Sequence, residues 1–163
     1  MDAQPHKVFL GFGSNLGNRH AIISEAQSLT EKLIGPVVGQ SAFYESQPWG
    51  FKSSNAFLNT VVCYSTTCSP REVLYLTQQV ERQLGRRQKS AGGIYHDRPI
   101  DIDLLLSDHG MVMEYDLRIP HPLLLQRDFV LRPLTEVFVL LDHQYFKCPL
   151  FPSGWMSKFL IGG

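Results

Sequence analysis

The chain has few cysteines and no excess of charge of either sign. Its 163 residues include three cysteines, and 15 lysines and arginines balance 15 aspartates and glutamates. An odd number of cysteines without paired spacing argues against a disulfide framework or a zinc site, and favours a reducing environment. A net charge of zero provides no general field for binding nucleic acid or an anionic membrane. Any anion site must therefore come from a local cluster of charges.

Long apolar runs are absent as well. No stretch approaches the roughly 20 residues of a membrane span, and the apolar run near the N-terminus is too short for a signal peptide. No repeat, low-complexity tract or linker divides the 163 residues, a length that suits one domain. We therefore expect a soluble, cytoplasmic protein in which residues 1–163 form a single domain, with no obligate protein partner indicated.

Hydrophobic periodicity and turn residues predict the order of the main elements. Strands are expected at 7–12, 37–44, 57–64 and 100–106, and helices at about 18–33 and 69–85. Asn18 is suited to cap the first helix, and Ser69 followed by Pro70 to start the second. An edge hairpin (111–112 with 117–119) and a short helix at 123–127 follow. The order β-α-β-β-α-β predicts an α+β, ferredoxin-like fold with C-terminal additions. In such a fold both helices pack on one face of an antiparallel sheet, and the other face, or the loops beside it, is free for ligands.

Asp101 and Asp103 carry the strongest chemical signal. Residues two apart on a strand share a face, so both carboxylates point one way while Ile100, Ile102 and Leu104 point into the core. Two adjacent carboxylates repel unless a cation lies between them, and Mg²⁺ binds one or two carboxylates together with water and substrate phosphates. A solvated acidic pair on an edge strand is the alternative. The strand is too apolar for an exposed edge, and we expect it to be central.

The segment before this strand is rich in cations: Arg82, Arg86, Arg87, Lys89 and Arg98. Cations beside a metal-binding acid pair suggest a polyphosphate ligand, because phosphate charge calls for both metal ions and arginine forks. A solvated loop is the alternative. Gly92 and Gly93 would let this loop move as a lid over the phosphates.

Three other features are suited to ligands. Phe57 and Asn59 share a strand face, and an aromatic ring beside an amide suits a flat heterocycle; core packing would explain Phe57 alone. The 11–17 segment lacks the residues of a phosphate-binding loop, and predicts a tight turn that lets another segment approach the backbone. His121 lies between two prolines, where it is either structural or a donor to phosphate.

Several stretches together are similar to one known family. They are GSNLGNR (13–19), SAFYESQPWG (41–50), FLNTVV (57–62), VERQLGR (80–86), DRPIDIDLLL (97–106) and RIPHPLLLQRDFVLRPL (118–134). This set resembles the 6-hydroxymethyl-7,8-dihydropterin pyrophosphokinases of folate biosynthesis. The resemblance implies that ATP and 6-hydroxymethyl-7,8-dihydropterin are the substrates, and that pyrophosphate passes from ATP to the pterin hydroxymethyl group with release of AMP.

The resemblance also implies roles for individual residues. The expected catalytic residues are Asp101 and Asp103, holding two Mg²⁺ ions on the triphosphate, and Arg86 and Arg98, clamping phosphates. The other expected ATP contacts are Gln78, Glu81, Lys89, Ile102, His121 and Arg127. The pterin is expected between Phe57 and Phe129, with further contacts from Ser46, Gln47, Trp49 and Asn59. The chain departs from the family pattern at Gln88, at Tyr95-His96-Asp97 before Arg98, and at Phe57 and Trp49.

Two rival functions come from other classes. A split βαβ sheet carrying aromatic residues also describes modules that bind single-stranded RNA, but zero net charge and an acid pair argue against a phosphate backbone as ligand. A nucleotidyltransferase or two-metal hydrolase would keep the metal pair and have no use for a pterin.

Overall fold

The computed structural model describes residues 4–86 and 96–141, so the expected lid glycines and Lys89 lie outside the described residues. The elements are β1 (His6–Ser14), α1 (Arg19–Ile34), β2 (Val37–Gln40), β3 (Tyr44–Ser46), β4 (Phe57–Thr66), α2 (Pro70–Gln83), β5 (Asp101–Ser107), β6 (Val112–Met113), β7 (Arg118–Ile119), a 3₁₀ turn (Leu124–Gln126) and α3 (Asp128–Leu140).

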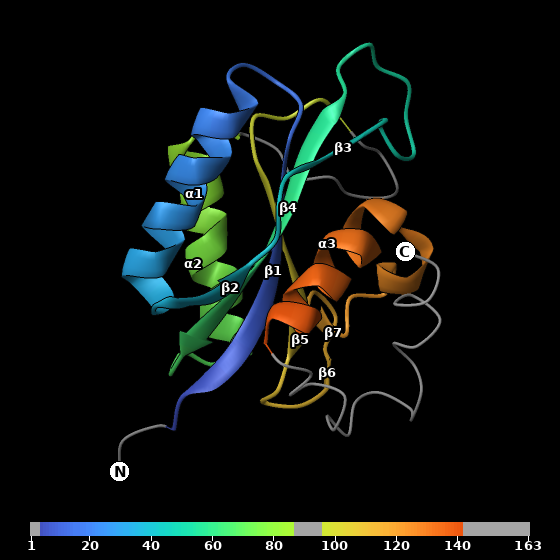
Figure 1. The fold of residues 1–163 in the computed structure, drawn as a ribbon. Coiled ribbons are helices and arrows are strands. Elements are labelled where there is room, and N and C mark those ends of the chain that lie inside the picture. Colours follow the sequence, from blue (N-terminus) through green and yellow to red (C-terminus); the bar gives the residue numbers. More distant parts are fainter. Residues whose placement is uncertain (1–3, 87–95, 142–163) are drawn as a thin grey trace.

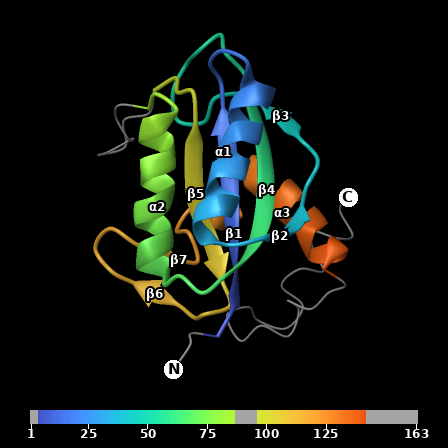
Figure 2. The same ribbon diagram turned by 90° about the vertical axis from the view of Figure 1, so that its left-hand side faces the viewer.

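One antiparallel sheet organises the fold. Its strand order is β2-β4-β1-β5, and β3 also pairs with β4. Helices α1 and α2 lie side by side on one face, and α3 lies on the other (Figures 1 and 2). The predicted ferredoxin-like arrangement is confirmed, as is the hairpin, which is formed by β6 and β7.

Local signals at the helix starts act as predicted. The side chain of Asn18 accepts a hydrogen bond from the Ala21 amide at 3.2 Å. Ser69 accepts from the amide of Glu72, and the Glu72 side chain accepts from the amide of Ser69, which completes a capping box. These caps set the point at which each helix leaves the sheet.

The prediction of an open sheet face is wrong over part of that face, because α3 packs there. Phe9 of β1 and Val61 of β4 meet Leu134 and Phe138 of α3 in a second apolar core. The rings of Phe9 and Phe138 are 5.2 Å apart. The end of this face near the start of α3 is left open by the residues that the structure describes.

Two strands also differ from expectation. The strand expected at 37–44 is interrupted after Gln40, and Ser41 bridges the gap by accepting a hydrogen bond from the Val61 amide at 3.0 Å. Strand β5 lies at the edge of the sheet and not at its centre. It is nevertheless buried, because Ile102 and Leu104 enter the core under α1 and α2 while Leu105 packs toward α3.

The part of the chain that the structure describes contains no helix long and apolar enough to cross a membrane. Cys63 and Cys68 are free thiols.

Candidate active site

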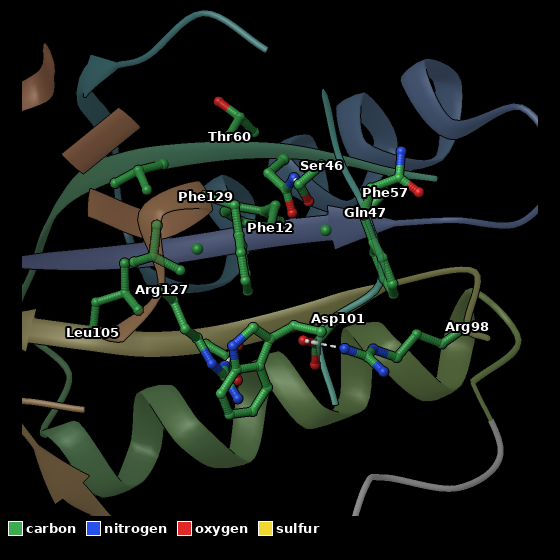
Figure 3. A pocket seen from close by; sticks show the side chains of 17 residues that line it. Phe12, Ser46, Gln47, Phe57, Thr60, Arg98, Asp101, Leu105, Arg127 and Phe129 are labelled. Carbon is green, nitrogen blue, oxygen red and sulfur yellow. Dashed lines mark hydrogen bonds and ion pairs between the residues drawn. The ribbon is translucent and has the colours of Figure 1, made fainter. Parts of the chain in front are cut away.

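A pocket opens between β4, β5 and the start of α3 (Figure 3). Its free space is about 560 Å³ including the open mouth. Every residue expected at the pterin lines it, and four residues expected at the phosphates join them. The predicted residues in the lining are Ser46, Gln47, Trp49, Phe57, Asn59, Arg98, Asp101, Asp103, Arg127 and Phe129. Residues from widely separated parts of the sequence therefore converge as the sequence predicted.

Aromatic rings and arginines form the walls of the pocket. Figure 3 shows Phe57 and Phe129 on either side of the open space. The guanidinium of Arg98 lies 4.8 Å from the centre of the Phe57 ring. That of Arg127 lies 4.5 Å from the Trp49 ring and 5.8 Å from the Phe129 ring. Such a slot suits a flat, polarisable ring, and cation–π contacts hold the arginines at its rim.

The Asn59 side chain is fixed by β3. Its amide nitrogen donates to the Tyr44 carbonyl at 3.0 Å and to the Ser46 hydroxyl at 2.8 Å. A Cβ atom at Gly13 would stand only 3.3 Å from the Asn59 amide oxygen, so the absence of a side chain at Gly13 leaves room for it. Asn59 thus has the partners that a buried amide requires.

The acid pair faces the pocket from β5, as the alternation predicted. The side chains of Asp101 and Asp103 are 16% and 23% exposed, so they do not form a solvated edge pair. Asp101 lies 3.5 Å from Arg98 and also pairs with Arg86. Asp103 lies 3.9 Å from Arg127. Cations on both sides offset the repulsion between the carboxylates.

Arg86 and Glu81 form a buried network beneath Asp101. The Arg86 side chain is 4% exposed, and its Nη1 donates to Glu81 at 2.8 Å and to the Ile100 carbonyl at 3.2 Å. The same Glu81 oxygen accepts from the Ile102 amide at 3.1 Å. Burial alone would lower the pKa of Arg86, but Asp101 and Glu81 outweigh burial and raise it. Arg86 is therefore a permanent buried cation that supports β5.

A second hollow lies across β5 from the first, with a free space of about 780 Å³ including its open mouth. Ile102 and His121 line it, and Asp103 lines both hollows. The His121 ring is oriented because its Nδ1 accepts from the Leu123 amide at 3.1 Å. Gln78 is half-buried on α2 and belongs to neither lining. Asp103 thus stands at the border of two adjacent cavities, and Asp101 lines the first.

Asn15 was not among the predicted site residues, yet it organises the rim. It is 3% exposed, and its side chain donates to Asp97 at 2.7 Å and accepts from the Arg98 amide at 2.8 Å. Its own amide donates to the Arg98 carbonyl at 3.2 Å. The prediction that the 11–17 turn lets another segment approach the backbone is confirmed. The available signal was an asparagine directly after Gly13-Ser14, at the end of a strand.

The fold and this site define an α+β domain in which an arginine-flanked carboxylate pair borders an aromatic slot, an arrangement suited to phosphoryl transfer. A sequence model of the 7,8-dihydro-6-hydroxymethylpterin-pyrophosphokinase (HPPK) family matches residues 9–139, and the chain belongs to that family.

Two curated relatives illustrate the match; both are named 2-amino-4-hydroxy-6-hydroxymethyldihydropteridine pyrophosphokinase. The Porphyromonas gingivalis protein is 50% identical over 131 residues, which cover 80% of this chain and 89% of the relative. The Aquifex aeolicus protein is 36% identical over 143 residues, which cover 88% and 87%.

Solved structures of HPPK-DHPS proteins share the fold. One, in complex with substrates, superposes with a TM-score of 0.73 at 15% identity, covering 98% of this chain and 44% of that chain. One from Plasmodium falciparum gives 0.65 at 16% identity, covering 82% and 41%. This chain therefore spans less than half of each.

Proposed function

We propose that this chain transfers the pyrophosphoryl group of ATP to the hydroxymethyl oxygen of 6-hydroxymethyl-7,8-dihydropterin, releasing AMP, as a step in folate biosynthesis. Asp103 carries the proposal, because it lines both the aromatic pocket and the hollow across β5. Transfer between two bound substrates requires their reacting groups to meet, and a shared wall between two cavities suits that need.

The donor set at the acid pair fits Mg²⁺. Among residues 4–86 and 96–141, no group of three or more His, Cys, Asp or Glu side chains is arranged to hold a metal. Two carboxylates on one strand face suit a hard ion that keeps water and phosphate oxygens as its other ligands. We propose that Asp101 and Asp103 hold two Mg²⁺ ions, which would neutralise charge on the triphosphate.

The protein groups in this proposal supply position and charge. Phosphoryl transfer needs alignment and charge neutralisation more than covalent help from the protein. Arg98 spans the two halves of the reaction, since it lies over Phe57 and within 3.5 Å of Asp101. We propose that Arg98 binds the pyrophosphoryl group while it is transferred. Arg127, stacked on Trp49 and near Asp103, would act on the same group from the opposite side.

The remaining assignments follow the two cavities. The pterin would lie between Phe57 and Phe129, with its edge at Asn59 and the Ser46–Trp49 segment. The nucleotide would occupy the hollow at Ile102 and His121 and would also contact Gln78, Glu81 and Arg86; Lys89, assigned to the nucleotide as well, lies outside the described residues. We further propose that residues 1–163 act as one catalytic domain, in the cytosol, where the free thiols of Cys63 and Cys68 would stay reduced.

The test is to identify the nucleotide released from ATP and Mg²⁺ with and without 6-hydroxymethyl-7,8-dihydropterin. AMP that forms only when the pterin is present supports the proposal. ADP would identify a simple kinase, and pterin-independent release of inorganic pyrophosphate would favour a nucleotidyltransferase. Failure of the folded, Mg²⁺-supplied protein to release any nucleotide product would contradict the proposal.

A further inference from the structure

Asp97 lies where three loops meet at the rim of the pocket. One of its oxygens accepts from the Asn15 side chain at 2.7 Å, and the other accepts from the Asn55 side chain at 3.0 Å. Ser53 also donates to this carboxylate from its side chain. The donors come from the β1–α1 connection and from the loop before β4, while Asp97 itself precedes β5. One side chain thus joins segments that are far apart in the sequence.

An ionised carboxylate is the group that this position requires. Its partners are all donors, and a carboxylate offers two acceptor oxygens without a competing hydrogen. The hydrogen bond from Ser53, followed by those from Asn15 and Asn55, holds the pKa of Asp97 below its ordinary value. The carboxylate therefore stays charged at neutral pH, and an amide here would turn an N–H group toward another donor.

Asp97 precedes Arg98 directly in the chain, and the Asn15 side chain adds a second connection between the two residues. The Asn15 side-chain nitrogen donates to Asp97 at 2.7 Å and to the Asn55 carbonyl at 3.1 Å, and its oxygen accepts from the Arg98 backbone amide. A rotation of Asn15 that broke one of these bonds would disturb the others. The backbone of Arg98 in turn carries the guanidinium that lies over Phe57 and beside Asp101.

We propose that Asp97 is a positioning residue: it holds Asn15, and through Asn15 it fixes the Arg98 backbone, so that the Arg98 guanidinium stays between the aromatic slot and the acid pair. Asp97 does this without contacting substrate. The proposal rests on the function proposed above, because Arg98 matters to the reaction only if that function is right.

The test variant is Asp97→Asn, which keeps the size of the side chain and replaces one acceptor by a donor. The matched control is Asp108→Asn, because Asp108 is a loop carboxylate that accepts from the Lys7 amide at 2.6 Å at the other end of β1. We expect kcat to fall about tenfold or more in Asp97→Asn, since a misplacement of ~1 Å can cost about a hundredfold. The dissociation constant for Mg-ATP should stay within about twofold, and Asp108→Asn should match the parent protein in both.

A double-mutant cycle separates positioning from a general structural role. If Asp97 acts through Arg98, Asp97→Asn should lower kcat by less than about twofold in a protein that already carries Arg98→Ala. Equal losses in the two backgrounds, or an unchanged kcat in the single variant, would overturn the proposal. Asn55→Ala, which removes one donor and leaves the Asn15 contact, serves as a milder variant and should give an intermediate loss.

Hydrogen exchange provides a readout without activity. The Arg98 amide is bonded to Asn15, so it should exchange faster in Asp97→Asn and at the parent rate in Asp108→Asn. If the parent protein releases no AMP, the function proposed above fails, and exchange at Arg98 still decides whether Asp97 positions it. If the parent is active and Arg98 exchanges unchanged in Asp97→Asn, the positioning role alone is wrong.

Discussion

Asp101 and Asp103 should respond differently to the same substitution, although they share one face of β5. Replacing either by asparagine removes a proposed metal ligand, so we expect turnover to fall by at least about a hundredfold in both variants. Stability should separate them. Asp101 pairs with buried Arg86, whereas Asp103 lies 3.9 Å from Arg127, at the limit of an ion pair.

The size of the difference in stability depends on which partners Arg86 and Arg127 keep after each substitution. Breaking a buried ion pair costs about 3–5 kcal/mol when one charge is left alone. Arg86 retains Glu81 at 2.8 Å and the Ile100 carbonyl at 3.2 Å, which lowers the cost to about 2 kcal/mol. The pair of Asp103 with Arg127 is longer, at 3.9 Å, and is worth about 1 kcal/mol. In a domain of this size, Asp101→Asn should then lower Tm by about 4–8 °C and Asp103→Asn by about 4 °C or less.

Urea and thermal unfolding, run beside the AMP-release assay on both variants, check these values. Equal losses of stability would refute the claim that Asp101 balances the buried Arg86 more strongly than Asp103 does. Full activity in either variant would refute the two-carboxylate metal site. Glu81→Gln provides a further control, because it removes the other partner of Arg86 and should destabilise the protein to a similar extent.

Three further predictions concern the pocket and the far end of β1. Arg98→Ala should lower kcat much more than it weakens Mg-ATP binding. If only the dissociation constant changes, Arg98 does not act on the pyrophosphoryl group during its transfer. Glu136 of α3 accepts from the Tyr44 hydroxyl at 2.5 Å and from the Ala42 amide at 3.0 Å, which holds β3 against the pocket. Glu136→Gln should raise the KM for pterin about threefold without changing the KM for ATP, and spectrophotometric titration should show the raised pKa of Tyr44 moving back toward its ordinary value. Burial and the neighbouring His109 lower the pKa of His6 from 6.5. The free energy of unfolding should therefore be highest above pH 6.5 and should fall as the pH drops through 6.5 toward the lower pKa of His6 in the folded protein. Urea unfolding at about pH 7.5 and 5.5 should show a smaller difference between the two pH values in His6→Gln than in the parent protein.

Features with a local cause were predictable from the sequence. The helix starts at Asn18 and Ser69 depend on side chains within three residues of the amides that they cap. The shared face of Asp101 and Asp103 depends only on the pleat of a strand, and so does that of Phe57 and Asn59. Pocket residues placed by alternation or by family motifs consequently converge in the structure.

Helix α3 was missed because its sequence carries conflicting signals. Pro133 lies inside it and ordinarily marks a helix boundary, and the prolines of the preceding segment favour irregular structure. Its helical state depends on burial of Leu134 and Phe138 against the sheet. The edge position of β5 is also a consequence of tertiary structure, because an apolar composition reports burial of the two faces and not the number of neighbouring strands.

The network around Asn15 shows why a site can be predicted residue by residue while its support is missed. Asn15 and Asp97 are 82 positions apart, and neither residue type in its local sequence predicts the other. Alternation placed Phe57 in the lining, and the family motifs supplied Arg98, but neither indicated what keeps the two in contact. That contact depends on the closure of three loops, each held by a hydrogen bond whose partner comes from elsewhere in the chain. The chain departs from the family pattern at Asp97, just before Arg98. If Asp97 has the role inferred here, this departure changes how the chain holds Arg98 in place and does not change the chemistry at Asp101 and Asp103.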